Sequence, residues 1–104
     1  MRTLDQATKG LMRAIARDLA GPVLFGEVAS TPWASGTFSG SRHRIEMRIN
    51  GLTANETARC FADGLEERDF PLSGHILADI NLVEIELGVD QVRIVIEALT
   101  VEEA

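Results

Sequence analysis

Apolar residues recur every three or four positions over residues 4–20, and this spacing predicts an amphipathic helix with one face on a core. Lysine and arginine residues occupy the opposite side of the same segment. Thr3 and Gln6 stand at the spacing of a capping box, in which both side chains bind backbone N–H groups at a helix start. Gly21 and Pro22 then favour a stop, because proline cannot continue the helical hydrogen bonds.

The next segment predicts two strands separated by a loop. Residues 23–29 are partly β-branched or aromatic, which favours a short strand, although Gly26 weakens it. Residues 30–41 are rich in serine, threonine and glycine, which is typical of a loop. Over residues 42–49, histidine, isoleucine and methionine alternate with arginine and glutamate. This period of two predicts a strand with one face toward a core.

A second amphipathic helix is expected in the middle of the chain. Thr53 and Glu56 repeat the capping-box spacing, and an apolar stripe runs from Ala54 to Leu65. Pro71 sets the latest position at which this helix ends.

The last third of the chain predicts a hairpin. Residues 76–87 alternate between apolar and polar, and the alternation slips by one place at Leu82 and Val83. A β-bulge there would return all the apolar residues to one face. A turn at residues 88–90 leads into a strand over 92–101, which is apolar on both faces. Two apolar faces are typical of a central strand that is covered on both sides.

The resulting order, αββαββ, predicts a single α+β domain over residues 1–104. We expect a two-layer sandwich in which both helices cover one face of a four-stranded antiparallel sheet. This order resembles that of a ferredoxin-like domain whose first strand has been moved to the end. The circular permutation implies that the last strand is interior. The two αββ halves also resemble each other, as any two amphipathic helices with caps would.

Charge and cysteine content narrow the classes of function. Sixteen acidic residues against ten basic ones give a net charge of -6, which disfavours binding to nucleic acid. Charged residues interrupt every apolar stretch, so we expect neither a membrane span nor an export signal. Cys60 is the single cysteine, which suits a reducing compartment, and a cytoplasmic location is expected.

The titratable residues form no catalytic pattern. His43 and His75 lack the spacing of a metal motif, so we expect structural roles for both and neither a metal nor a cofactor. Cys60 lies on a helix flank of small residues, where a buried and inert thiol is expected. An enzyme is the least favoured alternative; it would use Cys60 or His75, with His43 and Asp79 as further candidates.

Three arginines line one face of the strand predicted over residues 42–49. Arg42, Arg44 and Arg48 could bind a small anionic ligand through their guanidinium groups. The alternative, which we favour, is a ladder of ion pairs with glutamates of neighbouring predicted strands, namely Glu84, Glu86 and Glu97.

The surplus of apolar strand surface favours a non-catalytic assembly or interaction module. Val95, Leu99 and Val101 would lie on the sheet face away from the helices and bury themselves against a second copy in a homodimer. Trp33 is a candidate interface anchor, because large aromatic residues are common at interfaces. A sensor or carrier of a small anionic molecule is the alternative function.

Overall fold

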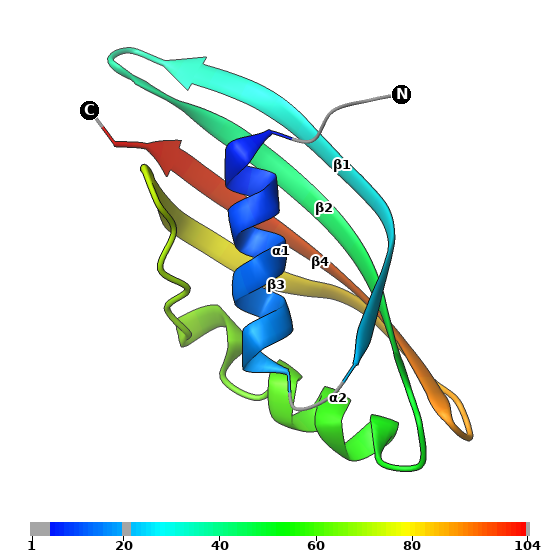
Figure 1. The fold of residues 1–104 in the computed structure, drawn as a ribbon. Helices are drawn as coiled ribbons and strands as arrows, with labels where there is room; N and C mark the ends of the chain where they lie inside the picture. Colours follow the sequence, from blue (N-terminus) through cyan, green and yellow to red (C-terminus); the bar gives the residue numbers. More distant parts are fainter. Residues whose placement is uncertain (1–4, 20–21, 104) are drawn as a thin grey trace.

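The computed structural model describes residues 5–19 and 22–103, which form a four-stranded antiparallel sheet with two helices in the order αββαββ (Figure 1). The sheet order is β1-β2-β4-β3, so the last strand is interior, as predicted. No helix in these described ranges is both long and apolar enough to cross a membrane. The elements are α1 (Gln6–Asp18), β1 (Val23–Ser35), β2 (Phe38–Asn50), α2 (Ala54–Ala62), the 3₁₀ turn η1 (Leu65–Glu67), β3 (His75–Leu87) and β4 (Gln91–Glu102).

Both helices pack on the same face of the sheet and enclose the core (Figure 1). Leu11 and Ile15 of α1 are fully buried, and α2 adds Ala58 and Phe61. The predicted alternation of β2 is confirmed, because every second residue from His43 to Ile49 is buried. The buried residues of the sheet are Ile45, Met47, Ile49, Ile80, Val92, Ile94, Ile96 and Ala98.

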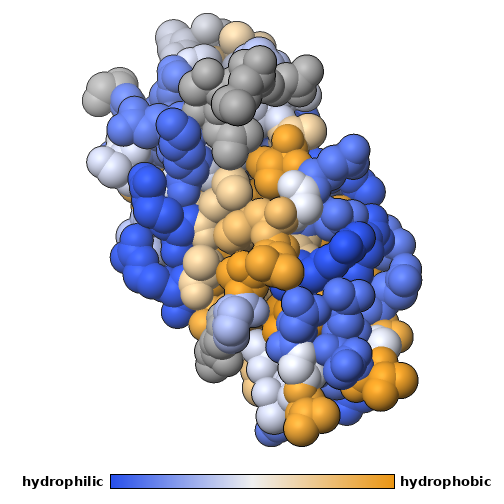
Figure 2. All heavy atoms as spheres, turned by 45° about the vertical axis from the view of Figure 1, so that its right-hand side comes forward, coloured by the Kyte–Doolittle hydropathy of each residue, from blue (hydrophilic) through white to orange (hydrophobic). Residues whose placement is uncertain are grey.

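Apolar side chains reach the surface on one side of the molecule. Figure 2 shows them as a band between two hydrophilic regions. Among the partly exposed residues packed against the core, α1 contributes Met12 and Ala14, and β1 contributes Val23, Phe25 and Val28. The helical layer therefore covers the edge strand β1 less completely than the strands at the centre.

The helix caps differ from the prediction. The N-cap of α1 is Asp5, whose carboxylate accepts a hydrogen bond from the Thr8 N–H at 2.7 Å; Thr3 lies outside the described residues. Thr53 is the N-cap of α2, as expected, but its side chain makes no capping hydrogen bond. Its backbone, at φ -102° and ψ 14°, departs from the extended geometry that lets a capping side chain reach back to the helix.

The loop predicted over residues 30–41 is wrong, because β1 continues to Ser35 and β2 begins at Phe38. Every residue from Val28 to Ser35 pairs with β2, and this pairing overrides the weak strand propensity of the proline and alanine residues in this segment. A two-residue turn closes the hairpin, with Gly36 at φ 57°. Gly40 serves a different purpose, because a Cβ there would overlap the carbonyl oxygen of Thr100 in β4.

β3 contains two irregularities, of which the sequence predicted one. The register against β4 shifts between Leu82 and Glu84, which confirms the expected bulge. A second shift lies between Leu77 and Asp79. This second bulge places Ile76 opposite Val101, on the face away from the helices, so the expected gathering of all apolar residues of β3 on one face is wrong.

Candidate functional site

The open face of the sheet, which we define as the face turned away from α1 and α2, carries most of the candidate residues. Directly paired residues share a face, so the strand registers arrange the outward side chains in rows. One row holds Arg42, Leu99 and Asp79, with Thr31 at the edge. The other rows hold Trp33, Gly40, Val101 and Ile76; Ala29, Arg44, Glu97 and Asn81; Glu46, Val95 and Glu84; and Leu24, Arg48, Arg93 and Glu86.

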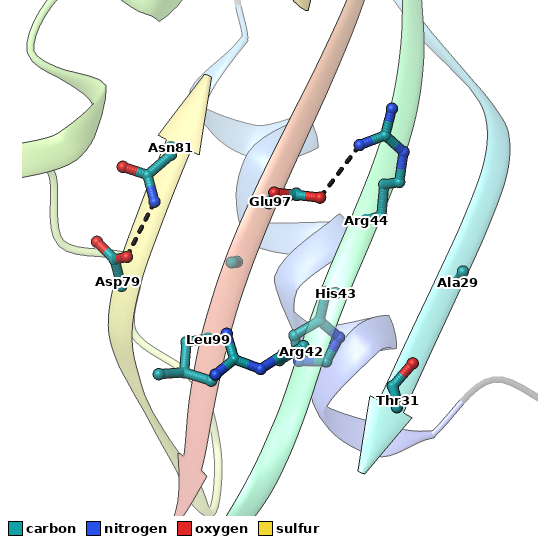
Figure 3. Close-up of a pocket in the computed structure, with 10 residues that line it drawn as sticks. Ala29, Thr31, Arg42, His43, Arg44, Asp79, Asn81, Glu97 and Leu99 are labelled. Atoms are coloured by element: carbon teal, nitrogen blue, oxygen red, sulfur yellow. Dashed lines mark hydrogen bonds and ion pairs between the residues drawn. The ribbon is translucent and has the colours of Figure 1, made fainter. Parts of the chain in front are cut away.

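Cross-strand ion pairs occupy the middle of the open face. Arg44 of β2 and Glu97, directly opposite it on β4, form an ion pair (Figure 3). Their charged groups are 3.1 Å apart, and this pair belongs to the ladder favoured from the sequence. Arg93 bridges two carboxylates, with 2.7 Å to Glu46 and 3.1 Å to Glu84. The hydrogen bond from Arg93 lowers the pKa of Glu46 below its usual range, and the same bond raises the pKa of Arg93.

The Arg93 bridge explains why Val95 is only 1% exposed in a single chain. Glu46 and Glu84 pair with Val95 from opposite sides, and both bind Arg93. The guanidinium group therefore lies above Val95 and, with the aliphatic parts of its neighbours, keeps water away. The expectation that Val95 needs a partner for its burial is wrong, because long charged side chains of the same chain provide the cover.

Apolar residues collect at one end of the open face, in what we call the end patch: Trp33, Phe38, Ile76, Leu99 and Val101. Phe38 is 63% exposed and Ile76 is 55% exposed, whereas the other three are half-buried. The fold thus brings Trp33, Leu99 and Val101 together and separates them from Val95. Sequence reasoning missed Phe38 because it fell in the predicted loop, and it misplaced Ile76 because the second bulge was unseen. The indole Nε1 of Trp33 is buried with no hydrogen-bond partner among the described residues.

A hollow of about 530 Å³ lies on the open face beside the end patch (Figure 3). Arg42 and Arg44 line it, but so do the carboxylates of Asp79 and Glu97. Arg48 lies apart, in another hollow together with Glu86. The structure therefore does not gather the three arginines around one site, and the hollow carries both signs of charge, whereas the less favoured alternative of an anion site called for basic residues. The remaining residues lining the first hollow are Ala29, Thr31, His43, Asn81, Ala98 and Leu99.

His43 lies in the core, on the side of β2 that faces α1. Its Nδ1 is 3.0 Å from the hydroxyl of Thr8, and its Nε2 is 2.8 Å from the hydroxyl of Thr100. The hydroxyl of Thr100 donates its single proton to the Ser41 carbonyl at 3.4 Å, so it accepts from the Nε2–H of His43. A neutral imidazole has only one N–H, so Nδ1 accepts from the hydroxyl of Thr8. Burial lowers the pKa of His43, against the opposing charge of Asp5. The predicted role as a hydrogen-bonded core histidine is confirmed.

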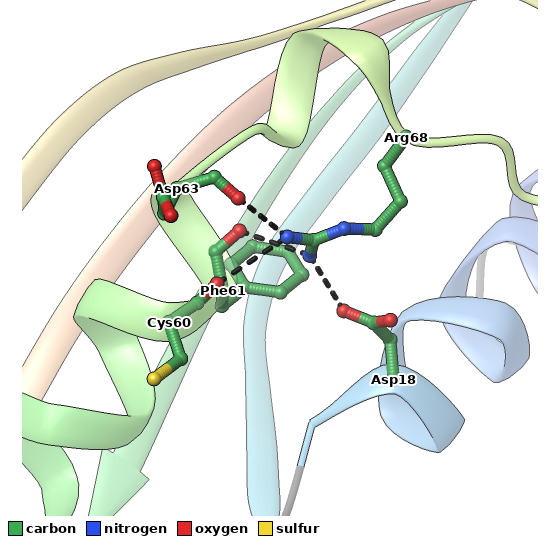
Figure 4. A network of polar contacts seen from close by, with 5 residues as sticks. All are labelled: Asp18, Cys60, Phe61, Asp63 and Arg68. Atoms are coloured by element: carbon green, nitrogen blue, oxygen red, sulfur yellow. Dashed lines mark hydrogen bonds and ion pairs between the residues drawn. The ribbon is translucent and has the colours of Figure 1, made fainter.

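Arg68 lies where the C-terminal ends of α1 and α2 meet. Its guanidinium group donates to the backbone carbonyls of Cys60, Phe61 and Asp63, at 3.3, 3.0 and 2.6 Å, and to the Asp18 carboxylate at 2.7 Å (Figure 4). A cation at the C-terminus of a helix satisfies carbonyl groups that have no partner within the helix. Arg68 thereby ties the end of α2 to the end of α1.

The thiol of Cys60 is exposed, so the expected burial is wrong. The buried side of α2 consists of Ala54, Ala58 and Phe61, and Cys60 falls outside that stripe. His75 begins β3 and Asp79 lies on the open face, so the fold does not assemble these groups with Cys60 into one site. The part of the chain that the structure describes contains no cluster of histidine, cysteine and carboxylate residues suited to a metal ion.

Comparison with known proteins places the fold. No protein-family model and no curated protein matches the chain. Among solved structures, the chain is similar to a protein of the virion of a native gene transfer agent particle, with a TM-score of 0.58 and 19% sequence identity. The similarity covers 92% of this chain and 94% of the other. The chain therefore shares its α+β fold with a component of a virion.

Proposed function

We propose that this chain is a non-catalytic assembly subunit that associates with copies of itself through the open face, as part of a virion-like particle. The observation that carries this proposal is the end patch, where Phe38 and Ile76 are 63% and 55% exposed beside half-buried Trp33, Leu99 and Val101. Apolar side chains gathered in one exposed area commonly mark a protein interface. The fold shared with a virion component supports the same role.

Sedimentation equilibrium over about 1 to 100 µM tests the proposal, because micromolar dissociation constants fall in this range. Self-association is expected, and Ile76→Thr and Phe38→Ser should each weaken it about tenfold, because both remove exposed apolar surface from the end patch. Leu52→Ser is the matched control, since Leu52 is 95% exposed but lies outside the sheet. A chain that stays monomeric throughout would contradict the proposed function.

Trp33 provides an independent optical measurement, because it is the only tryptophan and lies in the end patch. Its fluorescence should shift to shorter wavelength as the protein concentration rises. A spectrum independent of concentration in a sample that self-associates would show that the copies meet elsewhere.

A second candidate function is the binding of a small anionic molecule, favoured by the hollow of about 530 Å³ that Arg42 and Arg44 line. Phosphate or a dicarboxylate should then raise the melting temperature of the chain, and Arg42→Gln should remove the increase while Arg13→Gln, on the distant surface of α1, keeps it. No shift with either anion would exclude this function for these ligands.

We also propose that residues 1–104 form a single, circularly permuted ferredoxin-like domain. The strand order β1-β2-β4-β3 supports this relation, since it is the order that follows when the first strand of that fold is moved to the end. A chain rearranged to begin at Gln91, with the original ends joined by a flexible linker, should unfold in a single transition like the natural chain. Failure of this rearranged chain to fold would argue against the relation.

A further inference from the structure

The open face carries opposite charges on the two sides of β4. β2 contributes three basic residues, Arg42, Arg44 and Arg48, and one acidic residue, Glu46, whereas the charged residues of β3 on this face are all acidic; β4 runs between the two strands. The acidic residues of β3 are Asp79, Glu84 and Glu86.

Part of this charge is neutralised within the chain. The pair of Arg44 with Glu97 and the bridge of Arg93 to Glu46 and Glu84 occupy the middle of the face. These groups carry their own partners, so covering them would leave no buried charge unpaired.

On the open face of β2, β4 and β3, four charged residues make no ion pair within residues 5–19 and 22–103: Arg42, Arg48, Asp79 and Glu86. They lie in two rows. Arg42 and Asp79 flank Leu99, and Arg48 and Glu86 flank Arg93. In each row the basic residue is on β2 and the acidic residue is on β3.

We propose that two copies of the chain stack open face on open face about a two-fold axis parallel to β4, with this strand at the centre. A half-turn about that axis places β2 of one copy opposite β3 of the other and β4 opposite β4. Each row of one copy then lies opposite the same row of the second copy. Arg42 of one copy then faces Asp79 of the other, Arg48 faces Glu86, and Leu99 meets the second Leu99. Symmetry forms each of the two charge contacts twice, whereas the contact between the Leu99 side chains lies on the axis and forms once. This inference rests on the proposed self-association and specifies its geometry.

The size of the face agrees with this arrangement. At ordinary strand spacing, the three opposed strands β2, β4 and β3 present roughly 560 Å² of flat area, and side-chain relief raises it toward the roughly 600 to 1,000 Å² per partner of standard interfaces. The strands of two stacked sheets cross at about 30°, so residues far from the crossing point lie displaced from their counterparts in the other copy. The long arginine side chains can span this displacement.

A pair of complementary variants tests the geometry. The acidic variant carries Arg42→Asp and Arg48→Asp, and the basic variant carries Asp79→Lys and Glu86→Lys. All four positions are exposed, so both variants should fold, which circular dichroism checks. Alone, each variant places like charges opposite one another, and its dimerisation should weaken by about tenfold or more. Mixed in equal amounts, they restore every pair, and native mass spectrometry should find the heterodimer.

The controls make the same kinds of charge change away from the sheet, on α1, α2 and η1. One chain carries Arg13→Asp and Arg59→Asp, and the other carries Glu56→Lys and Glu66→Lys. These variants should dimerise like the natural chain. Variants of the open face that still self-associate as tightly as the natural chain would overturn this inference and leave the proposed self-association standing. Failure of the mixed variants to form dimers would overturn the stacking geometry in the same way. A natural chain that is monomeric would remove both proposals.

Discussion

His43 and Thr100 meet across neighbouring strands of the core, with 2.8 Å between the imidazole Nε2 and the threonine hydroxyl. The other ring nitrogen accepts from Thr8 of α1, so one neutral side chain links the helix to the centre of the sheet. Both threonines are fully buried. The neutral form of His43 is therefore part of the packing between the two layers.

Acid should destabilise the fold through His43. Burial lowers its pKa in the folded chain, whereas the unfolded chain keeps the ordinary value of about 6.5, so the unfolded state binds more protons below that pH. The stabilisation is complete above about pH 6.5 and is lost as the pH falls through the lower folded value. Urea unfolding at successive pH values should show a steeper loss for the natural chain than for His43→Gln.

The same variant tests the hydrogen bonds at neutral pH. His43→Gln should lower the free energy of unfolding by about 1 to 3 kcal/mol, because buried hydroxyl groups lose well-placed partners. His75→Gln, at the start of β3, should keep most of the pH dependence of the natural chain. An equal pH dependence in His43→Gln and the natural chain would refute the role assigned to His43.

Gly40 and Gly10 should respond to alanine in opposite directions. Gly40→Ala places a Cβ on the Thr100 carbonyl oxygen, which forces β2 and β4 apart and should cost about 1 to 3 kcal/mol or more. Gly10 lies within α1, and its new Cβ would lie 3.7 Å from Leu72, an ordinary contact. Gly10→Ala should stabilise the chain by about 0.5 to 1 kcal/mol through helix propensity. Thermal unfolding of both variants distinguishes the two effects.

The clamp made by Arg68 should be sensitive to the shape of its side chain. Arg68→Lys keeps the charge but loses the fork that binds three carbonyl groups and Asp18 together, and should cost about 1.5 to 3 kcal/mol. Arg59→Lys, on the exposed side of α2, should change stability by less than about 0.5 kcal/mol. Chemical denaturation measures both, and a cycle with Asp18→Asn should show coupling. Equal effects of the two lysine variants would contradict the clamp.

The bridge over Val95 should be visible in the titration of Glu46. Arg93→Gln removes the hydrogen bond that holds the pKa of Glu46 down, so this pKa should rise toward its ordinary value. NMR of the side-chain carboxyl carbon follows the titration directly. Arg48→Gln removes only a weaker charge effect and should raise the pKa less. A Glu46 pKa that is unchanged in Arg93→Gln would show that the bridge does not persist in solution.

Repeating patterns in the sequence predict much of this fold. The period of two in β2, the amphipathic stripes of α1 and α2, and the slip at Leu82 each reflect contacts that one segment makes with a common core. The two apolar faces of β4 similarly predict its interior position in the sheet. Burial imposes such periods on any segment that packs, so they can be read without knowing the neighbouring strands.

Other features depend on which segments meet. Residues 30–41 extend the hairpin only because the backbone groups of the two strands pair with each other. Cys60 is exposed because α2 packs on the sheet through Ala54, Ala58 and Phe61, which depends on how the helix is placed. The bulge that turns Ile76 outward follows from the register against β4.

The sequence by itself determined the order of helices and strands, the core-facing residues of the regular segments and the presence of arginines on one face of β2. Tertiary structure alone decided which charges neutralise one another, that Arg93 shelters Val95, and that Trp33, Leu99 and Val101 share an end with Phe38 and Ile76. The physical reason is the distance along the chain between the residues that interact. Periodicity records how a segment faces the core, whereas ion pairs and surface patches arise from residues far apart in the chain whose positions follow from strand order, register and bulges.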